Sequence, residues 1–257
     1  VHELDSYLSE HGYRGDLLLM HSGGGSMTAA LVDRFPLRLA ASSIAGGAMA
    51  ARHIAEQCGF TDAIALDMGG TSTDITLINQ GQVRVVKHWW VEYGHPISFP
   101  GIEMSTIGAG GGTIAWVDDA HALRNGPHSA GADPGPASYH RGGTLPTNTD
   151  ANLCLGRLGP TLAAGQVNLD EAAAANAIGQ HVAQHLGMST STAAASMIQV
   201  ADVAMASAGV TLLRGDCSRT SGADGDRSAA PGHHFRIGLP TCRYSSRLLS
   251  DVPRARP

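Results

Sequence analysis

The sequence predicts an α/β protein in which helices pack on a mixed sheet. Three observations lead to this class. Short apolar runs alternate with glycine turns, a string of glycines and hydroxyl residues joins two apolar strands, and two alanine-rich helices follow late in the chain. The chain has 257 residues, of which 43% are hydrophobic and 15% charged. Because this apolar content is too high for a disordered chain, the sequence indicates a folded globular protein.

The first elements are a strand and two helices. Residues 17–20 are an apolar run that enters a glycine turn, as expected of a buried strand. We expect a helix over residues 26–35, because its first residue is a serine that can cap it and Pro36 ends it. A second helix over residues 43–57, rich in alanine and glycine, takes Ser42 or Ser43 as its cap.

The middle of the chain is predicted to be mostly strand. Residues 63–67 and 75–78 are apolar, and a turn after the second run leads to a third strand at 83–86. These three strands predict an antiparallel meander. Two further strands are expected at residues 102–107 and 113–117.

The last part of the chain changes character twice. Residues 120–149 are rich in Gly, Pro, Ser and His, and we expect a long loop there. Helices follow over residues 170–186 and from 191 to about 213. Eight of the sixteen arginines then fall in the last 44 positions, where apolar periodicity is lost. We therefore expect one folded region over residues 1–213 and a divergent arginine-rich tail, disordered or frameshifted, over residues 214–257.

Charge and cysteine content exclude several classes of function. The net charge is -5 and the pI about 6.2, which gives no reason to expect a nucleic-acid or anionic membrane partner. The apolar runs fall short of the roughly 20 residues of a membrane-spanning helix. The four cysteines form no zinc or disulfide pattern, so we expect reduced thiols in a cytoplasmic protein.

The most informative segment is residues 67–74, with the sequence Asp-Met-Gly-Gly-Thr-Ser-Thr-Asp. It places a carboxylate at the end of a strand, beside glycines whose backbone N–H groups can approach an anion. A nucleotide phosphate with Mg²⁺ needs this combination, because the carboxylate can hold the metal or its waters. The simpler alternative is an ordinary β-hairpin with a glycine turn.

This string resembles the phosphate-binding hairpin of actin-like ATPases, and specifically the hydantoinase/oxoprolinase family. The resemblance extends over residues 1–213 and is specific, because separated motifs occur in the family's order. The five other matching segments are residues 18–25, 43–48, 107–115, 129–136 and 149–153.

The resemblance implies an actin-like ATPase (ribonuclease H-like) core and an enzyme that uses ATP and Mg²⁺. Such an enzyme activates a cyclic amide, of the hydantoin or 5-oxoproline type, by phosphoryl transfer before ring-opening hydrolysis. One alternative is a subunit of an acetone or acetophenone carboxylase. Others are a non-catalytic remnant and a different actin-like ATPase, such as a sugar kinase.

The resemblance also implies roles for individual residues. Asp67 is the expected metal-binding residue, and Asp67 with Asp74 forms the expected catalytic pair. The residues expected to contact the cofactor are Gly69, Gly70, Thr71, Thr73, Gly110, Gly111 and Gly112. Two alternatives stay open: Asp74 can cap its own turn, and the glycines at 108–112 can serve close packing instead of ligand binding. Glu103 is expected to be an exposed strand carboxylate.

The resemblance further implies that the core is incomplete. Family members carry a first phosphate hairpin upstream and an adenosine-contacting segment after the last helix, and neither pattern occurs here. We therefore expect an internal fragment that turns over weakly or not at all, because misplaced phosphates cost rate. A small-molecule substrate and a second, hydantoinase B-type subunit are the implied partners.

Overall fold

The computed structural model describes residues 1–87, 89–92, 95–162 and 165–220. The chain divides into two compact units, Val1–Leu212 and Leu213–Pro257. Only the end of one helix is described in the second unit. The predicted tail over residues 214–257 therefore lies largely outside the described residues, and the boundary at residue 213 stays a prediction.

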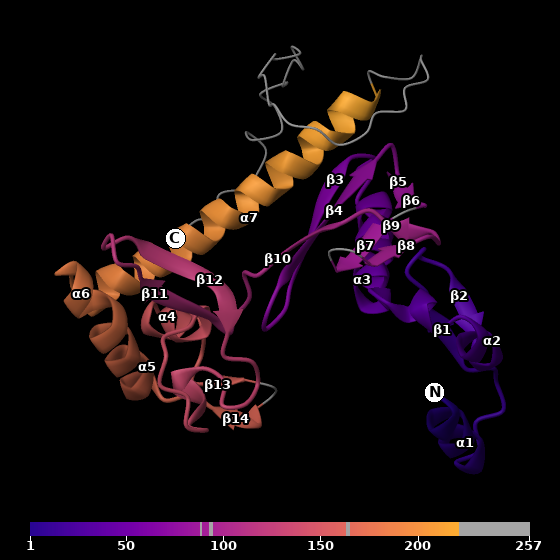
Figure 1. Ribbon diagram of the computed structural model, residues 1–257. Helices are drawn as coiled ribbons and strands as arrows, with labels where there is room; N and C mark the ends of the chain where they lie inside the picture. The colour runs from indigo at the N-terminus through magenta and orange to yellow at the C-terminus, as the bar shows by residue number, and fades with distance from the viewer. Residues whose placement is uncertain (88, 93–94, 163–164, 221–257) are drawn as a thin grey trace. The chain divides into compact units, whose positions relative to one another are not determined.

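The described residues begin with helices and short strands, continue with an unbroken series of strands from β3 to β12, and end mostly in helices (Figure 1). The helical elements are α1 (His2–Glu10), α2 (Ala29–Arg34), η1 (Pro36–Leu39), α3 (Ser42–Gln57), η2 (Ala137–Tyr139), α4 (Asn148–Cys154), α5 (Glu171–Ile178), η4 (Gly179–Ala183), α6 (Gln184–Leu186) and α7 (Thr190–Thr220). The strands are β1 (Leu18–Met20), β2 (Ser26–Thr28), β3 (Ala63–Met68), β4 (Thr73–Asn79), β5 (Gln82–Val83), β6 (Val85–Val86), β7 (Trp89–Glu92), β8 (His95–Ile97), β9 (Gly101–Ile102), β10 (Ser105–Ile107), β11 (Thr113–Val117), β12 (Leu123–Ser129), β13 (Thr161–Leu162) and β14 (Val167–Asn168).

The strands of the described residues pair only in antiparallel order. The α/β class is confirmed, but small antiparallel sheets stand in place of the one mixed sheet that we expected. Short connections between successive strands explain this, because parallel neighbours need a crossover of a dozen residues or more.

The largest sheet has four strands and contains the first two strands of the predicted meander. The third strand, expected at residues 83–86, is divided between β5 in this sheet and β6, which pairs with β9 in a separate sheet. Its order is β10-β4-β3, and β5 pairs with the end of β4. Gln80 and Gly81 join β4 to β5 with φ angles of 50° and 71°, as a tight hairpin turn requires. Helix α3 packs on this sheet (Figure 1). Its buried Ala45 and Ala48 form a small core with Ile102.

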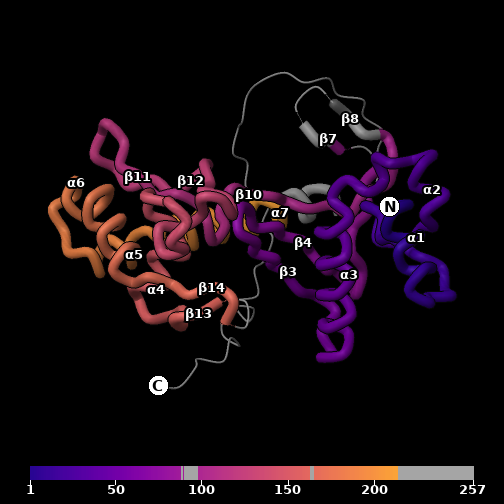
Figure 2. Tube along the Cα trace, turned by 90° about the horizontal axis from the view of Figure 1, so that it is seen from below, coloured from indigo at the N-terminus to yellow at the C-terminus, as the bar shows by residue number. Residues whose placement is uncertain are grey.

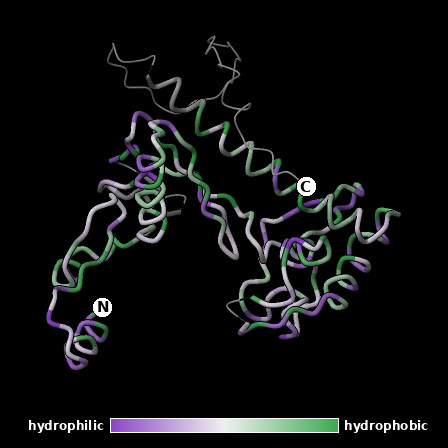
Figure 3. Tube along the Cα trace, turned by 180° about the vertical axis from the view of Figure 1, so that it is seen from behind, coloured by the Kyte–Doolittle hydropathy of each residue, from purple (hydrophilic) through white to green (hydrophobic). Residues whose placement is uncertain are grey.

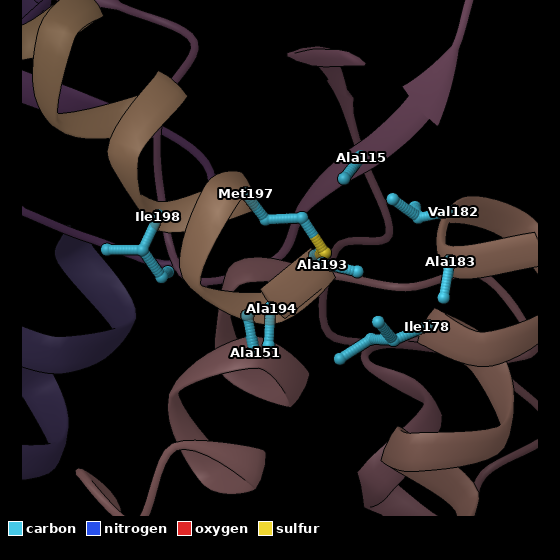
Figure 4. Packing of buried hydrophobic residues seen from close by; sticks show 9 residues of the cluster. All are labelled: Ala115, Ala151, Ile178, Val182, Ala183, Ala193, Ala194, Met197 and Ile198. Carbon is cyan, nitrogen blue, oxygen red and sulfur yellow. The ribbon is translucent and has the colours of Figure 1, made fainter. Parts of the chain in front are cut away.

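A second core lies where α4, α5, η4 and α7 meet β11. Figure 4 shows the side chain of Met197 of α7 pointing toward Ala115 of β11 and Val182 of η4. All three residues are completely or almost completely buried, and the other members of the cluster are four alanines and two isoleucines. The views in Figure 1 and Figure 2 agree that α4 and α5 lie side by side. Because alanine side chains are short, the helices can approach closely around the few larger side chains of this core.

Two predicted helix starts are wrong. Residue 26 lies in β2, because β2 folds back on β1 and pairs Met20 with Ser26, so α2 begins only at Ala29. Helix α3 begins at Ser42, but its N-cap is Ala41 in the left-handed region, at a φ of 59°. The start of α2 is therefore set by the pairing of β1 with β2, and the start of α3 by the left-handed backbone at Ala41. Neither start is set by a serine side chain that caps the helix.

The predicted long loop and the predicted end of the last helix also differ from the structure. Residues 123–129 form β12, which pairs with β11 although it contains Gly126 and Pro127. Pairing with β11 outweighs the weak strand propensity of these residues. Helix α7 continues through Thr220, seven residues past the expected end at Leu213.

Helix α7 is longer and more apolar than we expected. Within the described residues, its segment Thr190–Leu213 is long and apolar enough, by length and composition, to cross a membrane. Figure 3 shows hydrophobic colours along much of this helix. Its first half supplies Ala193, Ala194, Met197 and Ile198 to the second core, and a core helix of a globular protein meets the same criterion.

Candidate functional site

Strands β3 and β4 form the hairpin that carries the predicted phosphate-binding string. Their register pairs Asp67 with Asp74 and Met68 with Thr73, so residues 69–72 are the loop at the tip. The Gly69 N–H donates to the Ser72 carbonyl oxygen at 2.8 Å, which closes the loop. The first three loop residues are exposed, so a ligand can reach their backbone.

Three consecutive amides of this loop have no protein partner among the described residues. Within the described part of the chain, the N–H groups of Gly70, Thr71 and Ser72 donate to no protein atom. Consecutive free N–H groups in a turn form a concave site that attracts anions. A Cβ on Gly70 would meet no heavy atom within 4 Å, so there is open space around this position. The loop therefore has the donors and the access that a phosphate group needs.

The second glycine cluster lies directly against this loop. The N–H groups of Gly111 and Gly112 donate to the carbonyl oxygens of Gly69 (3.0 Å) and Gly70 (2.6 Å). The Gly110 N–H donates to the Thr113 hydroxyl at 2.6 Å. A Cβ on Gly110 would come within 2.6 Å of the Thr71 backbone.

The geometry of the cluster favours the close-packing alternative, because its amides are already used within the protein. The three glycines at 110–112 each donate their N–H to a neighbouring group. Their direct contact with a nucleotide stays a prediction.

The two predicted carboxylates lie side by side across the hairpin, on the side of α3. Asp67 and Asp74 both line a pocket of about 220 Å³ between α3 and the sheet. This is below the roughly 300–1,000 Å³ of sites that enclose a drug-sized ligand, so the pocket suits only a small part of a nucleotide. A Cβ on Gly47 of α3 would lie 2.9 Å from Asp67 Oδ2, which shows how closely helix and carboxylate approach.

Thr73 and Asp74, the last two residues of the string, form hydrogen bonds with neighbouring segments. Asp74 Oδ1 accepts a hydrogen bond from the Thr106 hydroxyl of β10 at 2.6 Å. Asp74 therefore lies in a strand, and the alternative that it caps its own turn is wrong. Thr73 is completely buried and donates its hydroxyl to the Ala109 carbonyl and toward the Met205 sulfur of α7. The Thr73 side chain thus supports the hairpin from behind.

The donor set fits a magnesium ion better than a metal held by protein ligands alone. No group of three or more His, Cys, Asp or Glu side chains that could hold a metal occurs within the described ranges. Mg²⁺ in nucleotide sites is held by one or two carboxylates together with phosphate oxygens and waters. Asp67, exposed at the end of β3 and beside the free amides, meets this requirement.

Several residues around the hairpin were not singled out from the sequence. Gly47 and Thr106 contact the two carboxylates, and Asn148 and Thr149 contact the glycine cluster. Asp150 is the third residue of α4 and forms a capping box with Thr147. The spacing Thr-x-x-Asp before an apolar run was the available signal for this box.

Other candidate groups lie outside the hairpin. Glu103 pairs with Arg84 at 3.3 Å and its side chain is only 20% exposed, so the prediction of an exposed carboxylate is wrong. Burial raises the pKa of the Cys154 thiol on α4, and the charges of Glu171 and Asp150 add to this. The Ala122 N–H and the Arg124 side chain lower the pKa of Asp118 in the turn before β12.

Comparisons with known proteins find a family that matches most of the chain. The family model described as Hydantoinase/oxoprolinase matches residues 1–218. The chain is 36% identical over 241 residues to the caprolactamase subunit alpha of Pseudomonas jessenii, which covers 92% of this chain and 34% of that protein.

Two solved structures resemble the fold. A nucleotide-free acetone carboxylase, from work on ATP-dependent acetone carboxylation, matches with a TM-score of 0.73 and 29% identity. It covers 84% of this chain and 30% of that chain. The ATP-dependent caprolactamase from Pseudomonas jessenii matches with a TM-score of 0.67 and 36% identity, over 81% of this chain and 30% of that one.

The chain thus spans about a third of the length of the relatives that it matches. The family match covers more than four fifths of the chain and includes the hairpin, the glycine cluster and the start of α4. This chain belongs to the hydantoinase/oxoprolinase family.

Proposed function

We propose that this chain is part of an ATP-dependent enzyme in which the loop at residues 69–72 binds the phosphates of ATP. The observation that carries the proposal is the row of free amides at Gly70, Thr71 and Ser72, next to the carboxylate of Asp67. Backbone amides and one metal-binding carboxylate are what phosphate hairpins need. The actin-like arrangement of the core is part of the same proposal.

The residues have separate roles in this proposal. Asp67 would hold Mg²⁺ directly or through its waters, and Mg²⁺ would supply neutralisation of the charge on the transferred phosphoryl group. The amides of the loop position the phosphates, while Asp74 keeps a second negative charge close to the metal. Thr73 and the glycine cluster hold the loop from behind.

The proposed reaction is the ring-opening hydrolysis of a cyclic amide. An amide carbonyl is unreactive toward water, and transfer of the γ-phosphoryl group to its oxygen, with release of ADP, makes the carbonyl carbon electrophilic. Water adds to this carbon, the C–N bond opens as the nitrogen takes up a proton, and an acyl phosphate remains. A second water hydrolyses the acyl phosphate to the carboxylate and phosphate. The name of the caprolactamase relative supports this class, since caprolactam is a cyclic amide.

The second candidate is ATP-dependent carboxylation of a ketone. The likeness to an acetone carboxylase structure favours it, because that match has the higher TM-score of the two. Both candidates use the same phosphate site, so they differ in the second substrate. Stimulation of ATP turnover by a lactam, but not by acetone with bicarbonate, would support the hydrolase.

We also propose that the working enzyme contains more polypeptide than this chain. Relatives are named as subunits, which supports a partner such as the hydantoinase B-type subunit. Because the chain spans about a third of these relatives, we expect it alone to bind nucleotide and to turn it over slowly or not at all.

Asp67→Asn tests the phosphate site. The change removes the charge from an exposed side chain, so the thermal midpoint without ligand should not change. Mg·ATP should stabilise the natural chain in a thermal-shift titration. In Asp67→Asn we expect the affinity for Mg·ATP to be at least tenfold weaker, which corresponds to about 1.4 kcal/mol of binding free energy. The binding of ATP by this variant should no longer depend on Mg²⁺.

The matched control is Asp119→Asn, which makes the same change at an exposed position in the turn before β12. It should leave the Kd for Mg·ATP unchanged. If both variants bind like the natural chain, Asp67 does not hold the metal. If the natural chain shows no binding at millimolar Mg·ATP, the chain is a remnant without a nucleotide site.

A further inference from the structure

The first turn of α4 is hydrogen-bonded to the glycine cluster. Asn148 Nδ2 donates to the Gly110 carbonyl oxygen at 2.9 Å, and Thr149 Oγ1 donates to the Gly111 carbonyl oxygen at 2.9 Å. The Thr149 backbone N–H also donates to Gly111 O at 2.7 Å. Asn148 is completely buried and Thr149 is 8% exposed, so water cannot easily replace these donors.

The glycine cluster connects α4 to the phosphate loop through hydrogen bonds. Its carbonyl groups are held by α4, and the N–H groups of Gly111 and Gly112 hold the carbonyl oxygens of Gly69 and Gly70. A chain of hydrogen bonds therefore runs from the buried start of α4 to the exposed tip of the β3–β4 hairpin.

The geometry of the peptide bond gives this chain a directional effect. In a trans peptide the C=O of one residue and the N–H of the next point in opposite directions. Holding the Gly69 carbonyl against the cluster therefore turns the Gly70 N–H away from the cluster. Holding the Gly70 carbonyl does the same for the Thr71 N–H. The two amides are directed to the open side before any anion arrives.

Asn148 itself is fixed on its other side. Asn125 of β12 donates to Asn148 Oδ1 at 2.7 Å and also to the Met197 carbonyl of α7 at 3.1 Å. Asp150 accepts from the Thr147 N–H at 2.9 Å in the capping box of α4. The donors of α4 thus have one orientation, set by β12, α7 and the cap.

We infer that Asn148 and Thr149 are positioning residues that hold the phosphate loop in its anion-binding shape. Among the described residues, the hydrogen bonds of Asn148 and Thr149 to this region go to Gly110 and Gly111, so both residues act through the glycine cluster. The inference rests on the proposed function for its effect on nucleotide, but the hydrogen-bond chain it describes can be tested without a ligand.

Two variants interrupt the chain with little change of shape. Asn148→Asp replaces the donating amide by an oxygen, and Thr149→Val replaces the donating hydroxyl by a methyl group. We expect the Kd for Mg·ATP to rise about tenfold for Asn148→Asp, and severalfold for Thr149→Val, whose backbone N–H still binds Gly111. Thr149→Ser keeps the hydroxyl and should restore the natural Kd.

A destabilised control separates positioning from folding. Val182→Ala removes buried volume from the second core at a residue whose side chain makes none of these hydrogen bonds. At a matched loss of thermal midpoint, it should bind Mg·ATP like the natural chain. If Val182→Ala weakens binding as much as Thr149→Val does, the role of Thr149 is only structural and the inference fails.

Hydrogen exchange supplies the readout that needs no nucleotide. The Gly111 and Gly112 amides, followed by NMR, should exchange faster in Thr149→Val than in Val182→Ala at equal global stability. Equal exchange rates would overturn the inference even if nucleotide binds. Faster exchange without any binding by the natural chain would keep the hydrogen-bond chain and reject the proposed function.

Discussion

Two glycine-rich segments meet at the candidate site, and they use glycine for different reasons. In the hairpin loop, Gly70 has open space where a Cβ would be, and its N–H has no partner within the described residues. In the cluster, Gly110 has backbone atoms of the loop at 2.6 Å from such a Cβ, and its N–H is bonded to Thr113. The hairpin loop leaves open space that a ligand can occupy, whereas the glycines of the cluster let two segments of backbone pack closely against each other.

This difference shows why similar composition does not mean similar function. Glycine lets a backbone approach any other group closely, whether that group is a phosphate or another peptide. A loop can present amides to a ligand only if something else holds it still, and here the packed segment does so. Under the proposed function, the exposed glycines bind phosphate and the packed glycines support the loop. A substitution in each segment tests this division.

The largest expected effect is that of Gly110→Ala. The new methyl group would overlap the backbone of Gly70 and Thr71, which cannot move without breaking the loop. Overpacking against rigid backbone predicts a loss of about 3 kcal/mol in the free energy of unfolding. Urea unfolding measures this loss, and binding of Mg·ATP should fall with it.

Gly70→Ala is the matched substitution in the other segment. Its methyl group has no neighbour within 4 Å, so stability should change by less than about 1 kcal/mol in either direction. Affinity for Mg·ATP should nevertheless fall, because the methyl group occupies the space that a phosphate needs. Equal losses of stability in the two variants would contradict the distinction between the segments.

A smaller effect on nucleotide binding is expected from a substitution at Gly47 of α3, which lies beside the carboxylate of Asp67. In Gly47→Ala the new Cβ would lie 2.9 Å from Asp67 Oδ2, so the carboxylate must turn away from its position. Alanine in a helix interior also stabilises by about 1 kcal/mol relative to glycine. We expect a slightly more stable protein whose Kd for Mg·ATP is roughly tenfold weaker.

Gly46→Ala is the control on the neighbouring residue of the same helix. Nothing lies within 4 Å of its added Cβ, so it should gain the same helix stability without any change in Kd. If both variants bind Mg·ATP equally well, the position of the Asp67 carboxylate is unimportant and only the loop amides carry the site.

Local patterns in the sequence were sufficient to predict the hairpin. Apolar runs on either side of residues 67–74 predicted β3 and β4, and the acidic and glycine residues predicted where a phosphate site would be. The strand β12 was missed because Gly126 and Pro127 have weak strand propensity, and only pairing with β11 makes this segment a strand.

The support behind the loop could not be predicted from local patterns. The separation of Asn148 from Gly110 is 38 residues, and nothing in either segment shows that they meet. The same holds for Gly47 and Asp67, which lie on different elements. Glycine composition alone left open whether residues 108–112 bind a ligand or pack, because the answer depends on which groups their amides find in the fold.

The smallest expected effect concerns the reactivity of a cysteine on α4, the helix that supports the glycine cluster. It tests whether α4 stays packed in solution. Cys154 ends α4 and is half-buried, whereas Cys58 after α3 is exposed. Burial and the nearby charge of Glu171 raise the pKa of the Cys154 thiol, so less reactive thiolate is present at a given pH. We expect iodoacetamide at pH 8.5 to alkylate Cys154 severalfold more slowly than Cys58, measured by peptide mapping.

The direction of the pH effect follows from the raised pKa. Between the ordinary thiol pKa of 9.0 and the raised value, the unfolded chain releases a proton that the folded chain keeps, so stability falls as the pH rises in this range. Glu171→Gln removes one cause of the shift and should speed the alkylation of Cys154 while leaving Cys58 unchanged. Alkylation of both cysteines at one rate in the natural chain would mean that α4 opens readily, and then the packed segment could not hold the phosphate loop.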